Sequence, residues 1–371
     1  MTGISDNIKR TKVKEELARR IVNGEFAYGS RFPGLHELGR ACGVSYVTIC
    51  KAVKMLADEG YLQNRPGIGY FVCYAKPDSE ARKEVNIIST PGFYRRCEAD
   101  FKSGMDEFRK HGWKVNLLLG DNLYQFKEQL NSPHAYSIIT TFNVNWERFS
   151  ATFSHMVNRT VMLGRLSGNP AITSIVCDEY ESVRLCMDSF AARGCKRVAL
   201  VTALPQSELE SMRIAAWRNR VLGSGLSMEW MRRHLISLDL ENQPEESGRI
   251  TALYRQWLTT NRKDTDAVIV SGYLNQFLAA CSAENVKIPD ELAVIFIGLL
   301  SRPYDKFEYL DNNFPGHFQY ALELLEDRFR SDHIIPGSWY FCPPRGIVSA
   351  PGRRTVSKPC RKQENDHAYL H

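Results

Sequence analysis

The first seventy residues contain the side chains with which a protein binds the phosphates and base edges of a nucleic acid. The groups suited to phosphate are Arg31, Lys51, Lys54 and Arg65. The groups suited to base edges are Tyr46, Val47 and Thr48, which follow one another directly. Gly67 and Gly69 lie two residues apart, so the backbone there can approach a phosphate without a Cβ in the way. This combination predicts a nucleic-acid contact.

The apolar pattern places these residues on three short helices and a hairpin. The helices are expected at 9–23, 33–42 and 45–59, and the hairpin strands at 61–63 and 70–74. Ser45 is expected to cap the third helix, because its hydroxyl can accept from a free backbone N–H of the first turn. A turn around Gly43 joins the second and third helices, which is typical of a helix-turn-helix. The hairpin would form a wing beside it.

The formal net charge of +6 is distributed unevenly over the 371 residues. Residues 1–74 hold 11 Lys and Arg against 7 Asp and Glu, and residues 346–371 hold 5 against 2. A basic N-terminal segment fits a polyanionic partner. No apolar run is long enough to span a membrane, and the charged N-terminus lacks the apolar core of a signal peptide. We therefore expect a cytoplasmic protein without a membrane partner.

No motif of catalysis or metal binding stands out in the sequence. The chain lacks G-x-S-x-G, a Walker loop, H-E-x-x-H and the Rossmann glycine fingerprint. Its ten cysteines include no C-x-x-C pair and no histidine at zinc spacing, so we interpret them as reduced thiols. We expect no enzyme activity, no cofactor and no metal site.

The stretch 12–72 resembles the winged-helix domain of GntR-family repressors. The matching landmarks are N-G-x-F-x-x-G-x-R-F-P at 23–33, G-V-S-x-x-T-I at 43–49 and A-V-K-M-L-A-D-E-G-Y-L at 52–62. The resemblance implies a transcription regulator that binds double-stranded DNA in a sequence-specific way. Because one winged helix contacts only a few base pairs, we expect a homodimer on an inverted-repeat operator.

Three positions depart from that family, whose members often place arginines there. This chain has His36, Tyr46 and Cys50 instead. An arginine can bind guanine with two hydrogen bonds, whereas tyrosine and cysteine cannot, so base readout is expected to differ and to be weaker. For Val47 and Cys50 the alternative is that they simply pack inside the helical domain.

After the winged helix, the pattern changes to a linker and then to buried strands that alternate with helices. Residues 75–84 include a proline and no large apolar side chain, which is typical of a linker. The strands are expected at 85–89, 114–119, 137–141, 160–163, 174–177, 197–202, 234–238, 267–270 and 292–297. Short apolar strands separated by helices predict parallel sheets covered on both faces, and nine of them favour two sheets over one.

This region resembles the effector domain of LacI-type repressors, which is built like a periplasmic sugar-binding protein. The most specific segments are V-C-D-E-Y at 176–180, A-A-R-G-C-K-R-V-A-L-V at 191–201 and T-D-A-V-I-V at 265–270. The resemblance implies a winged helix-turn-helix at 1–74, a linker at 75–84 and a two-lobed α/β domain at 85–345. The expected boundaries are 85–177 with 301–330 for the first lobe, 178–300 with 331–345 for the second, and 346–371 for a basic, disordered tail.

In that fold the effector lies between the lobes, near the carboxyl ends of the strands. The resemblance implies that the contacts come from Tyr94, Arg95, Asp178, Arg213, Trp217 and Tyr273. Arg213 falls where the family keeps an arginine that binds ligand hydroxyls or carboxylates. The aromatic residues Tyr94, Trp217 and Tyr273 are candidates for stacking on a sugar ring, or alternatively for packing the hinge.

Two polar anchors of that family are absent, because Gly272-Tyr273 and Leu299-Leu300 stand in their places. Losing a buried polar partner typically costs about 1–3 kcal/mol. With Arg213 present and the acids absent, an acidic sugar or a sugar phosphate is expected ahead of a neutral monosaccharide. The overall prediction is a repressor controlled by a carbohydrate or sugar derivative. The alternative is a constitutive DNA-binding regulator whose large domain only dimerises.

Overall fold

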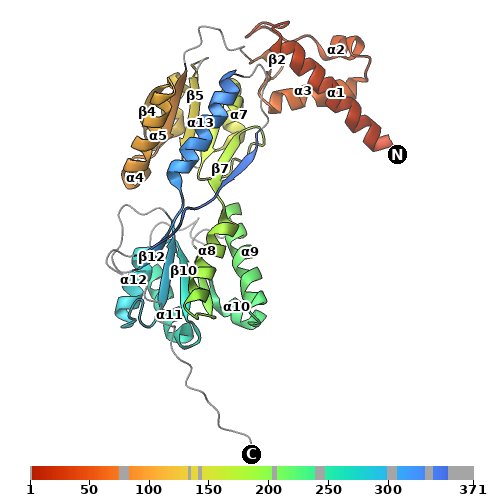
Figure 1. The fold of residues 1–371 in the computed structure, drawn as a ribbon. Helices are drawn as coiled ribbons and strands as arrows, with labels where there is room; N and C mark the ends of the chain where they lie inside the picture. Colours follow the sequence, from red (N-terminus) through yellow and green to blue (C-terminus); the bar gives the residue numbers. More distant parts are fainter. Residues whose placement is uncertain are drawn as a thin grey trace, which may run out of the picture. The chain divides into compact units, whose positions relative to one another are not determined.

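The computed structural model describes residues 2–74, 83–132, 135–140, 144–202, 207–238, 247–298, 307–330 and 337–349. The chain forms two compact units, Met1–Val176 with Pro315–Cys342, and Cys177–Phe314 with Pro343–His371. The first unit holds the N-terminal winged helix and one α/β domain, and the second unit holds another α/β domain (Figure 1).

The N-terminal domain has the predicted three helices and hairpin. Its elements are α1 (Thr2–Val22), α2 (Leu35–Ala41), α3 (Tyr46–Asp58), β1 (Leu62–Arg65) and β2 (Gly69–Val72). The two strands are antiparallel, with Leu62 opposite Val72. One apolar cluster, which includes Leu17, Ile49 and Leu56, packs the helices against the hairpin. Burial of this shared apolar face holds the elements together, since isolated helices as short as α2 and α3 are marginal in water.

The turn between α2 and α3 depends on two glycines and a cap. Gly43 has a φ of +64°, a conformation that favours glycine. A Cβ on Gly39 would lie 3.3 Å from the carbonyl oxygen of Val44, so glycine lets the turn pack against α2. The Ser45 hydroxyl accepts from the backbone N–H of Thr48 at 3.2 Å, as predicted for an N-cap.

The α/β domain of the first unit is built on a six-stranded sheet with the order β13-β7-β6-β5-β3-β4. Its strands are β3 (Glu84–Ser89), β4 (Lys114–Leu119), β5 (Ala135–Thr140), β6 (Thr160–Leu163), β7 (Thr173–Cys177) and β13 (Trp339–Cys342). Its helical segments are α4 (Pro91–Arg96), α5 (Glu98–Lys110), η1 (Leu123–Phe126), α6 (Lys127–Leu130), α7 (Trp146–Thr152), η2 (Ser154–Arg159) and α13 (Phe314–Arg330). The pairs from β4 to β7 are parallel, as the alternation of strands and helices predicts.

The second α/β domain has a six-stranded sheet with the order β14-β12-β11-β10-β8-β9. Its strands are β8 (Val198–Thr202), β9 (Leu235–Ser237), β10 (Ala267–Ser271), β11 (Ala293–Ile297), β12 (Glu308–Asp311) and β14 (Gly346–Val348). Its helical segments are α8 (Glu179–Ala192), α9 (Glu208–Gly223), α10 (Met228–His234), α11 (Ser247–Asn261), η3 (Arg262–Asp264) and α12 (Leu274–Ala283). Within the described strands of this sheet, only β14, which is antiparallel to β12, departs from parallel pairing.

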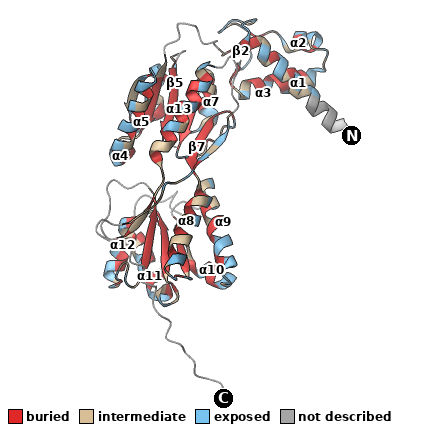
Figure 2. Ribbon diagram, in the orientation of Figure 1, coloured by how far each residue is buried: buried red, intermediate tan, exposed pale blue. Residues whose placement is uncertain are grey.

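The central strands β8, β10 and β11 of this second sheet are buried on both faces, which explains why each of them is a continuous apolar run (Figure 2). Along β8 and β10, Leu200 and Ile269 pack with α8, α9 and α10 on one face. Their neighbours Val201 and Val268 pack with α11 and α12 on the other. The alternation places successive side chains of each strand in two different cores.

Three strands near the C-terminus correct the predicted lobe boundaries. β12 belongs to the second sheet, although 301–330 was assigned to the first lobe. β13 belongs to the first sheet, although 331–345 was assigned to the second. β14 lies at an edge of the second sheet, inside the segment 346–371 that was predicted to be a disordered tail. β12 and β14 are short and mostly half-buried, and β13 exposes Trp339 and Phe341, so no buried apolar run announces these strands. Residues 75–82 of the predicted linker and 350–371 of the tail lie outside the described residues.

Among the described residues, the cysteines follow the predicted chemistry with one exception. Eight described cysteines carry free thiols, and five of these are buried. Burial raises the pKa of the Cys97 and Cys281 thiols to about 12, so both are protonated at neutral pH. Cys195 is different, because its sulfur takes part in a disulfide. No helix in the described part of the chain is long and apolar enough to cross a bilayer.

Candidate nucleic-acid interface and effector site

One face of α3 is exposed to solvent and carries the predicted base-contacting residues. Tyr46 and Val47 are 48% and 60% exposed. Lys51 and Lys54 are exposed at helical spacing from Val47, so the three side chains lie along one stripe. The opposite face is buried in the domain core through Ile49, Ala52, Val53 and Leu56. The alternative in which Val47 packs inside the domain is therefore wrong, whereas Thr48 and Cys50 are half-buried.

Of the three residues that stand in place of the family arginines, Tyr46 contacts the other two, His36 and Cys50. The rings of His36 and Tyr46 are stacked, with centroids 4.3 Å apart and planes inclined by 20°. A hydrogen bond with the Cys50 side chain, one turn further along α3, raises the pKa of the Tyr46 phenol. Together, His36 and Tyr46 present an aromatic face and a neutral hydroxyl to solvent. They have no paired donors with which to bind guanine as an arginine does.

The hairpin brings two further arginines to the same domain surface. Arg65 stacks over the Phe71 ring at 4.0 Å, and its Nε donates to Gln63 Oε1 at 3.4 Å. At the turn, Ile68 N–H donates to the Arg65 carbonyl at 3.0 Å, and Gly67 has a φ of +74°. A Cβ on Gly69 would lie 3.5 Å from Arg31 Nε, so Arg31 passes over this glycine.

The ion pairs of the domain leave these cations available. Three acids of the domain are engaged elsewhere, in the pairs Lys14–Glu59, Arg19–Glu16 and Arg20–Glu25. Within the described side chains of residues 9–74, no ion pair involves Arg31, Arg40, Lys51, Lys54 or Arg65. The side formed by α2, α3 and the hairpin therefore has an excess of free positive charge, as a phosphate-binding surface requires.

Arg213, the main effector-site candidate, is buried between two glutamates. It is 7% exposed. Its Nε and Nη2 lie 2.8 and 2.7 Å from Glu179 Oε2, and its Nη1 donates to Glu210 Oε1. Glu210 also accepts from Thr202 Oγ1 and from Ser271 Oγ, the latter at 3.1 Å. We call Glu179, Thr202, Glu210, Arg213 and Ser271 the glutamate–arginine cluster.

The cluster lies where the resemblance placed an effector site within the second domain. Thr202 and Ser271 are the last residues of β8 and β10, and Glu179 is the first residue of α8. Glu210 and Arg213 are one turn apart on α9, with the Ser207 hydroxyl capping that helix. The carboxyl edge of the sheet thus collects five polar side chains, as parallel α/β sheets commonly do.

The charge of this cluster bears on the expected ligand preference. Burial raises the pKa of Glu179, and the nearby Arg213 opposes that rise. One guanidinium faces two carboxyl groups, so the cluster is neutral or negative rather than positive. Sequence reasoning missed Glu179 and Glu210. Two signals were present, namely Glu179 inside V-C-D-E-Y and Glu210 at helical spacing from Arg213.

Trp217 does not offer the stacking face that was expected of it. It is 0% exposed, and its indole N–H donates to the Val198 carbonyl at 2.8 Å within the core between α9 and the sheet. The expected ligand contact conflicts with this burial.

Asp178, another effector-site candidate, caps α8. It accepts from Glu181 N–H at 3.0 Å, which occupies one of its oxygens.

The other three candidates remain predictions. Tyr273 is half-buried at the start of α12, with a φ of +45°. In the other unit, Tyr94 is half-buried against Phe101, with ring centroids 5.3 Å apart, and Arg95 is exposed. Each presents some surface to solvent, as an effector contact requires.

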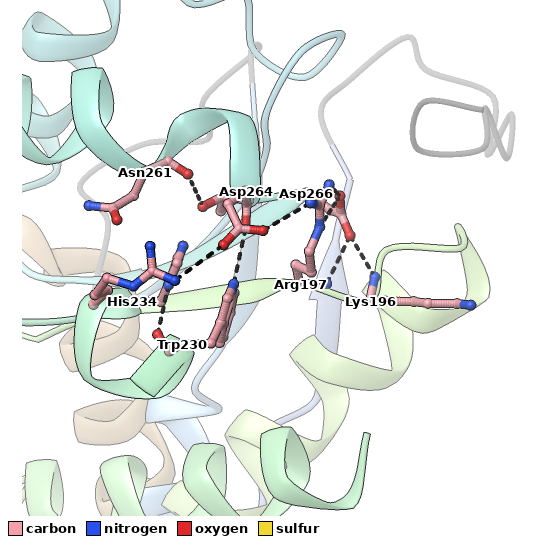
Figure 3. Close-up of polar contacts among 9 residues, drawn as sticks. Lys196, Arg197, Trp230, His234, Asn261, Asp264 and Asp266 are labelled. Carbon is pink, nitrogen blue, oxygen red and sulfur yellow. Dashed lines mark hydrogen bonds and ion pairs between the residues drawn. The ribbon is translucent and has the colours of Figure 1, made fainter. Parts of the chain in front are cut away.

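A second polar network holds the opposite, amino ends of β8 and β10 (Figure 3). Asp266 accepts from the backbone N–H groups of Lys196 and Arg197 at 2.9 and 2.8 Å and from the Arg197 guanidinium at 2.8 Å. The Lys196 side chain points away from the network (Figure 3). His234 is fully buried, stacks on Trp230 at 3.8 Å and donates from Nδ1 to the Trp230 carbonyl at 2.7 Å. The described residues contain no group of His, Cys, Asp and Glu arranged to hold a metal ion, and we interpret this network as structural.

Comparison with known proteins supports the assignment of the N-terminal domain. Residues 9–72 match the model of the family described as bacterial regulatory proteins, gntR family. The histidine utilization repressor of Klebsiella aerogenes is 34% identical over 90 residues, which cover 24% of this chain and 37% of that protein. The HTH-type regulator YieP of Escherichia coli (strain K12) is 46% identical over 55 residues, covering 15% and 24%. The matched part is thus a GntR-family helix-turn-helix domain, and it spans less than half of either relative.

Solved structures resemble the chain over most of its length. The CelR–cellobiose complex, a transcriptional regulator, has a TM-score of 0.58 at 14% identity and covers 85% of this chain and 98% of its own. Transcription regulator CcpA of Lactococcus lactis has a TM-score of 0.56 at 15% identity and covers 72% and 97%. These likenesses confirm the predicted fold, in which a helix-turn-helix region is followed by two α/β domains built on parallel sheets.

Proposed function

We propose that the chain is a transcriptional repressor that binds an inverted-repeat operator as a homodimer, in the cytoplasm and without catalytic activity. The observation that carries the proposal is the exposed stripe of α3, where Tyr46 and Val47 stand beside the free cations Lys51 and Lys54. A helix of this kind can enter the major groove while neighbouring cations bind phosphate.

The residues of this surface divide into two roles. Arg31, Lys51, Lys54 and Arg65 bind phosphates and contribute affinity for any DNA sequence. Tyr46, Val47 and Thr48 contact base edges, with His36 stacked behind Tyr46. A bidentate arginine–guanine contact discriminates by about 1–3 kcal/mol against the wrong base. Without such an arginine at these positions, the operator is expected to be read through hydroxyl and methyl contacts instead.

The test is a titration of selected operator DNA with the full-length protein. The operator is first enriched from a random duplex pool, and binding is followed by fluorescence anisotropy at several salt concentrations. Lys51→Ala and Arg65→Ala are expected to weaken all duplexes alike and to lower the salt slope by about one each. Tyr46→Ala is expected to change the ranking of duplexes. Arg19→Ala is the control, because its guanidinium pairs with Glu16 on α1. A Tyr46→Ala protein with the wild-type ranking contradicts the assigned roles.

We propose a carbohydrate as the effector. Similar folds have been solved with sugars, such as the CelR–cellobiose complex and a LacI family regulator from Lactobacillus casei with bound glucose, the latter with a TM-score of 0.50 at 17% identity, covering 68% of this chain and 96% of that one. The glutamate–arginine cluster offers carboxylate and hydroxyl groups suited to sugar hydroxyls. Because the cluster is not positive, a neutral, hydroxyl-rich ligand is now expected ahead of an acidic sugar or a sugar phosphate.

One observation favours the constitutive alternative. The guanidinium of Arg213 is bound on both sides by glutamates of the same domain, so the cluster is complete without a ligand. A thermal-shift screen of neutral sugars, sugar acids and sugar phosphates separates the two functions. A neutral sugar that stabilises the protein and changes operator affinity supports effector control. No stabilisation by any compound, with intact DNA binding, supports the constitutive regulator.

A further inference from the structure

The end of the recognition helix α3 contacts the α/β domain of the same unit. Asn158, in η2, donates from Nδ2 to the carbonyl oxygen of Glu59, the residue that ends α3. The next residue, Gly60, has a φ of +83°. A Cβ there would lie 2.7 Å from Asn158 Nδ2 and 3.0 Å from the Ser154 carbonyl oxygen. Glycine is thus required by the contact as well as by the turn.

Two further contacts surround this one. Cys73 Sγ and Ser154 Oγ lie 3.4 Å apart, immediately after β2. Gln63 Nε2, on β1, donates to the Ala151 carbonyl oxygen at 3.5 Å. The winged helix therefore touches η2 and its surroundings through the end of α3, the hairpin strand and the chain that follows. None of the proposed DNA-contacting residues takes part in these described contacts, so the exposed stripe of α3 stays available.

Asn158 is itself held by a buried arginine of α13. Arg328 Nη1 donates to the Asn158 carbonyl oxygen at 3.0 Å and to that of Thr160 at 3.4 Å. Its Nη2 donates to Thr173 Oγ1 on β7. Burial lowers the pKa of Arg328 to about 10, which leaves it charged at neutral pH. A buried cation bound to fixed oxygens holds those oxygens in one arrangement, because each would otherwise lose a charged hydrogen bond.

The elements joined by Arg328 flank two of the three points at which the chain passes between the two units. β7 ends at Cys177, where the chain enters the second unit, and α13 begins at Phe314, where it returns. Arg328 binds both elements to the segment that holds Glu59 and Gly60. A contiguous chain of hydrogen bonds thus runs from the crossing segments to the end of the recognition helix.

We propose that Asn158 and Arg328 are positioning residues for DNA recognition. They hold the winged helix in a fixed orientation on the first α/β domain. The part of this proposal that concerns DNA rests on the proposed function, whereas the docking itself does not. Because each winged helix is then fixed on its α/β domain, the α/β domains set the distance between the two α3 helices of a dimer. The dimer then binds operators of one half-site spacing. A movement of β7 or α13 is transmitted to α3 through Arg328 and Asn158.

The docking is tested by ¹⁵N relaxation on the full-length protein. The wild-type winged-helix amides are expected to report the same correlation time as those of the first α/β domain. In Gly60→Ala and Asn158→Asp, the winged-helix amides are expected to report a several-fold shorter time. Gly24→Ala is the matched control, because Gly24 has a φ of +79° and a Cβ there would have no neighbour within 4 Å. It carries the same backbone strain without the contact, and it should behave as the wild type.

The positioning role is tested by changing the spacing between the half-sites of a selected operator by one base pair at a time. Wild type and Gly24→Ala are expected to lose about tenfold in affinity away from the best spacing, a difference of about 1.4 kcal/mol. Gly60→Ala and Asn158→Asp are expected to flatten this profile. Asn158→Asp is isosteric and replaces the donor by a charged carboxylate oxygen that can only accept, so it tests the hydrogen bond if Gly60→Ala fails to fold.

The outcomes separate the two proposals. Equal correlation times in wild type and both variants, or an unchanged spacing profile, overturn the positioning role. A wild type whose winged helix already tumbles independently overturns it as well. If the relaxation data show a docked winged helix but the protein binds no DNA, the fixed orientation is supported and the proposed function is refuted.

Discussion

Replacing Arg213 by methionine tests whether the glutamate–arginine cluster has the charge balance described above. The substitution keeps much of the side-chain volume but removes the only cation that faces Glu179 and Glu210 in the described structure. Both glutamates are buried, and removing one partner of a buried ion pair typically costs about 3–5 kcal/mol. We therefore expect Arg213→Met to lower the free energy of unfolding of the second domain by that amount at pH 7.

The loss of stability in Arg213→Met has an upper limit that depends on pH, because a buried glutamate can bind a proton instead of staying charged. A glutamate with an ordinary pKa of about 4.3 can be protonated at pH 7 for about 3.7 kcal/mol and at pH 5 for about 1 kcal/mol. In the variant, the folded state would bind protons that the unfolded state releases, so its stability is present at low pH and is lost as the pH rises. The destabilisation should fall to about 1–2 kcal/mol at pH 5.

The assay is urea unfolding followed by circular dichroism at both pH values. Arg184→Met is the matched control, because Arg184 also pairs with two acids, Glu181 and Asp188, but on the exposed surface of α8. It should cost at most about 1 kcal/mol at either pH. A variant that also carries Glu179→Gln and Glu210→Gln should recover most of the lost stability. An Arg213→Met protein as stable as the control at pH 7, or equally destabilised at both pH values, would refute the reasoning.

Three further predictions concern stability. Trp217→Ala should lower the free energy of unfolding by about 3–5 kcal/mol, since it leaves a cavity in the core under α9, and a loss below about 1 kcal/mol in urea titrations speaks against a core role. Burial lowers the pKa of His234, so the unfolded chain binds the proton more readily, and wild-type thermal stability should fall as the pH drops below about 6.5. His234→Phe, which can still stack on Trp230, should reduce that slope, and an unchanged slope excludes His234 as its source. Ser45→Ala should cost about 1 kcal/mol of winged-helix stability and Ser45→Gly only a few tenths, and equal melting temperatures for all three proteins contradict the cap.

The sequence was sufficient to predict those helices and strands whose own residue pattern reflects how they are buried. Predicted strands such as β5, β8, β10 and β11 are buried along their whole length, because parallel strands inside these sheets are covered on both faces. The edge strands β4 and β9 are only half-buried. The wing and the recognition helix carry their own turn and cap residues, such as Gly67 and Ser45. Such signals are local, so a sequence shows them directly.

The parts that were not predicted depend on residues far apart in the chain. β12 and β14 form edge pairs across more than thirty residues, and neither carries an apolar run. Arg213 was singled out from the resemblance, but its partner Glu179 lies 34 residues away, and only folding brings the two together. Trp217 was taken for a ligand contact because an aromatic residue near a sugar site and an aromatic residue in a core look alike in a sequence.

The most direct test of the central claim is the affinity of the full-length protein for its selected operator as a function of salt. Regulation through DNA requires that the exposed cations beside α3 bind phosphate. The logarithm of the affinity should fall linearly with the logarithm of the salt concentration, and Lys51→Ala should reduce the slope by about 0.9. A protein that binds no duplex at about 50 mM salt, or a slope unchanged by Lys51→Ala, would contradict the account.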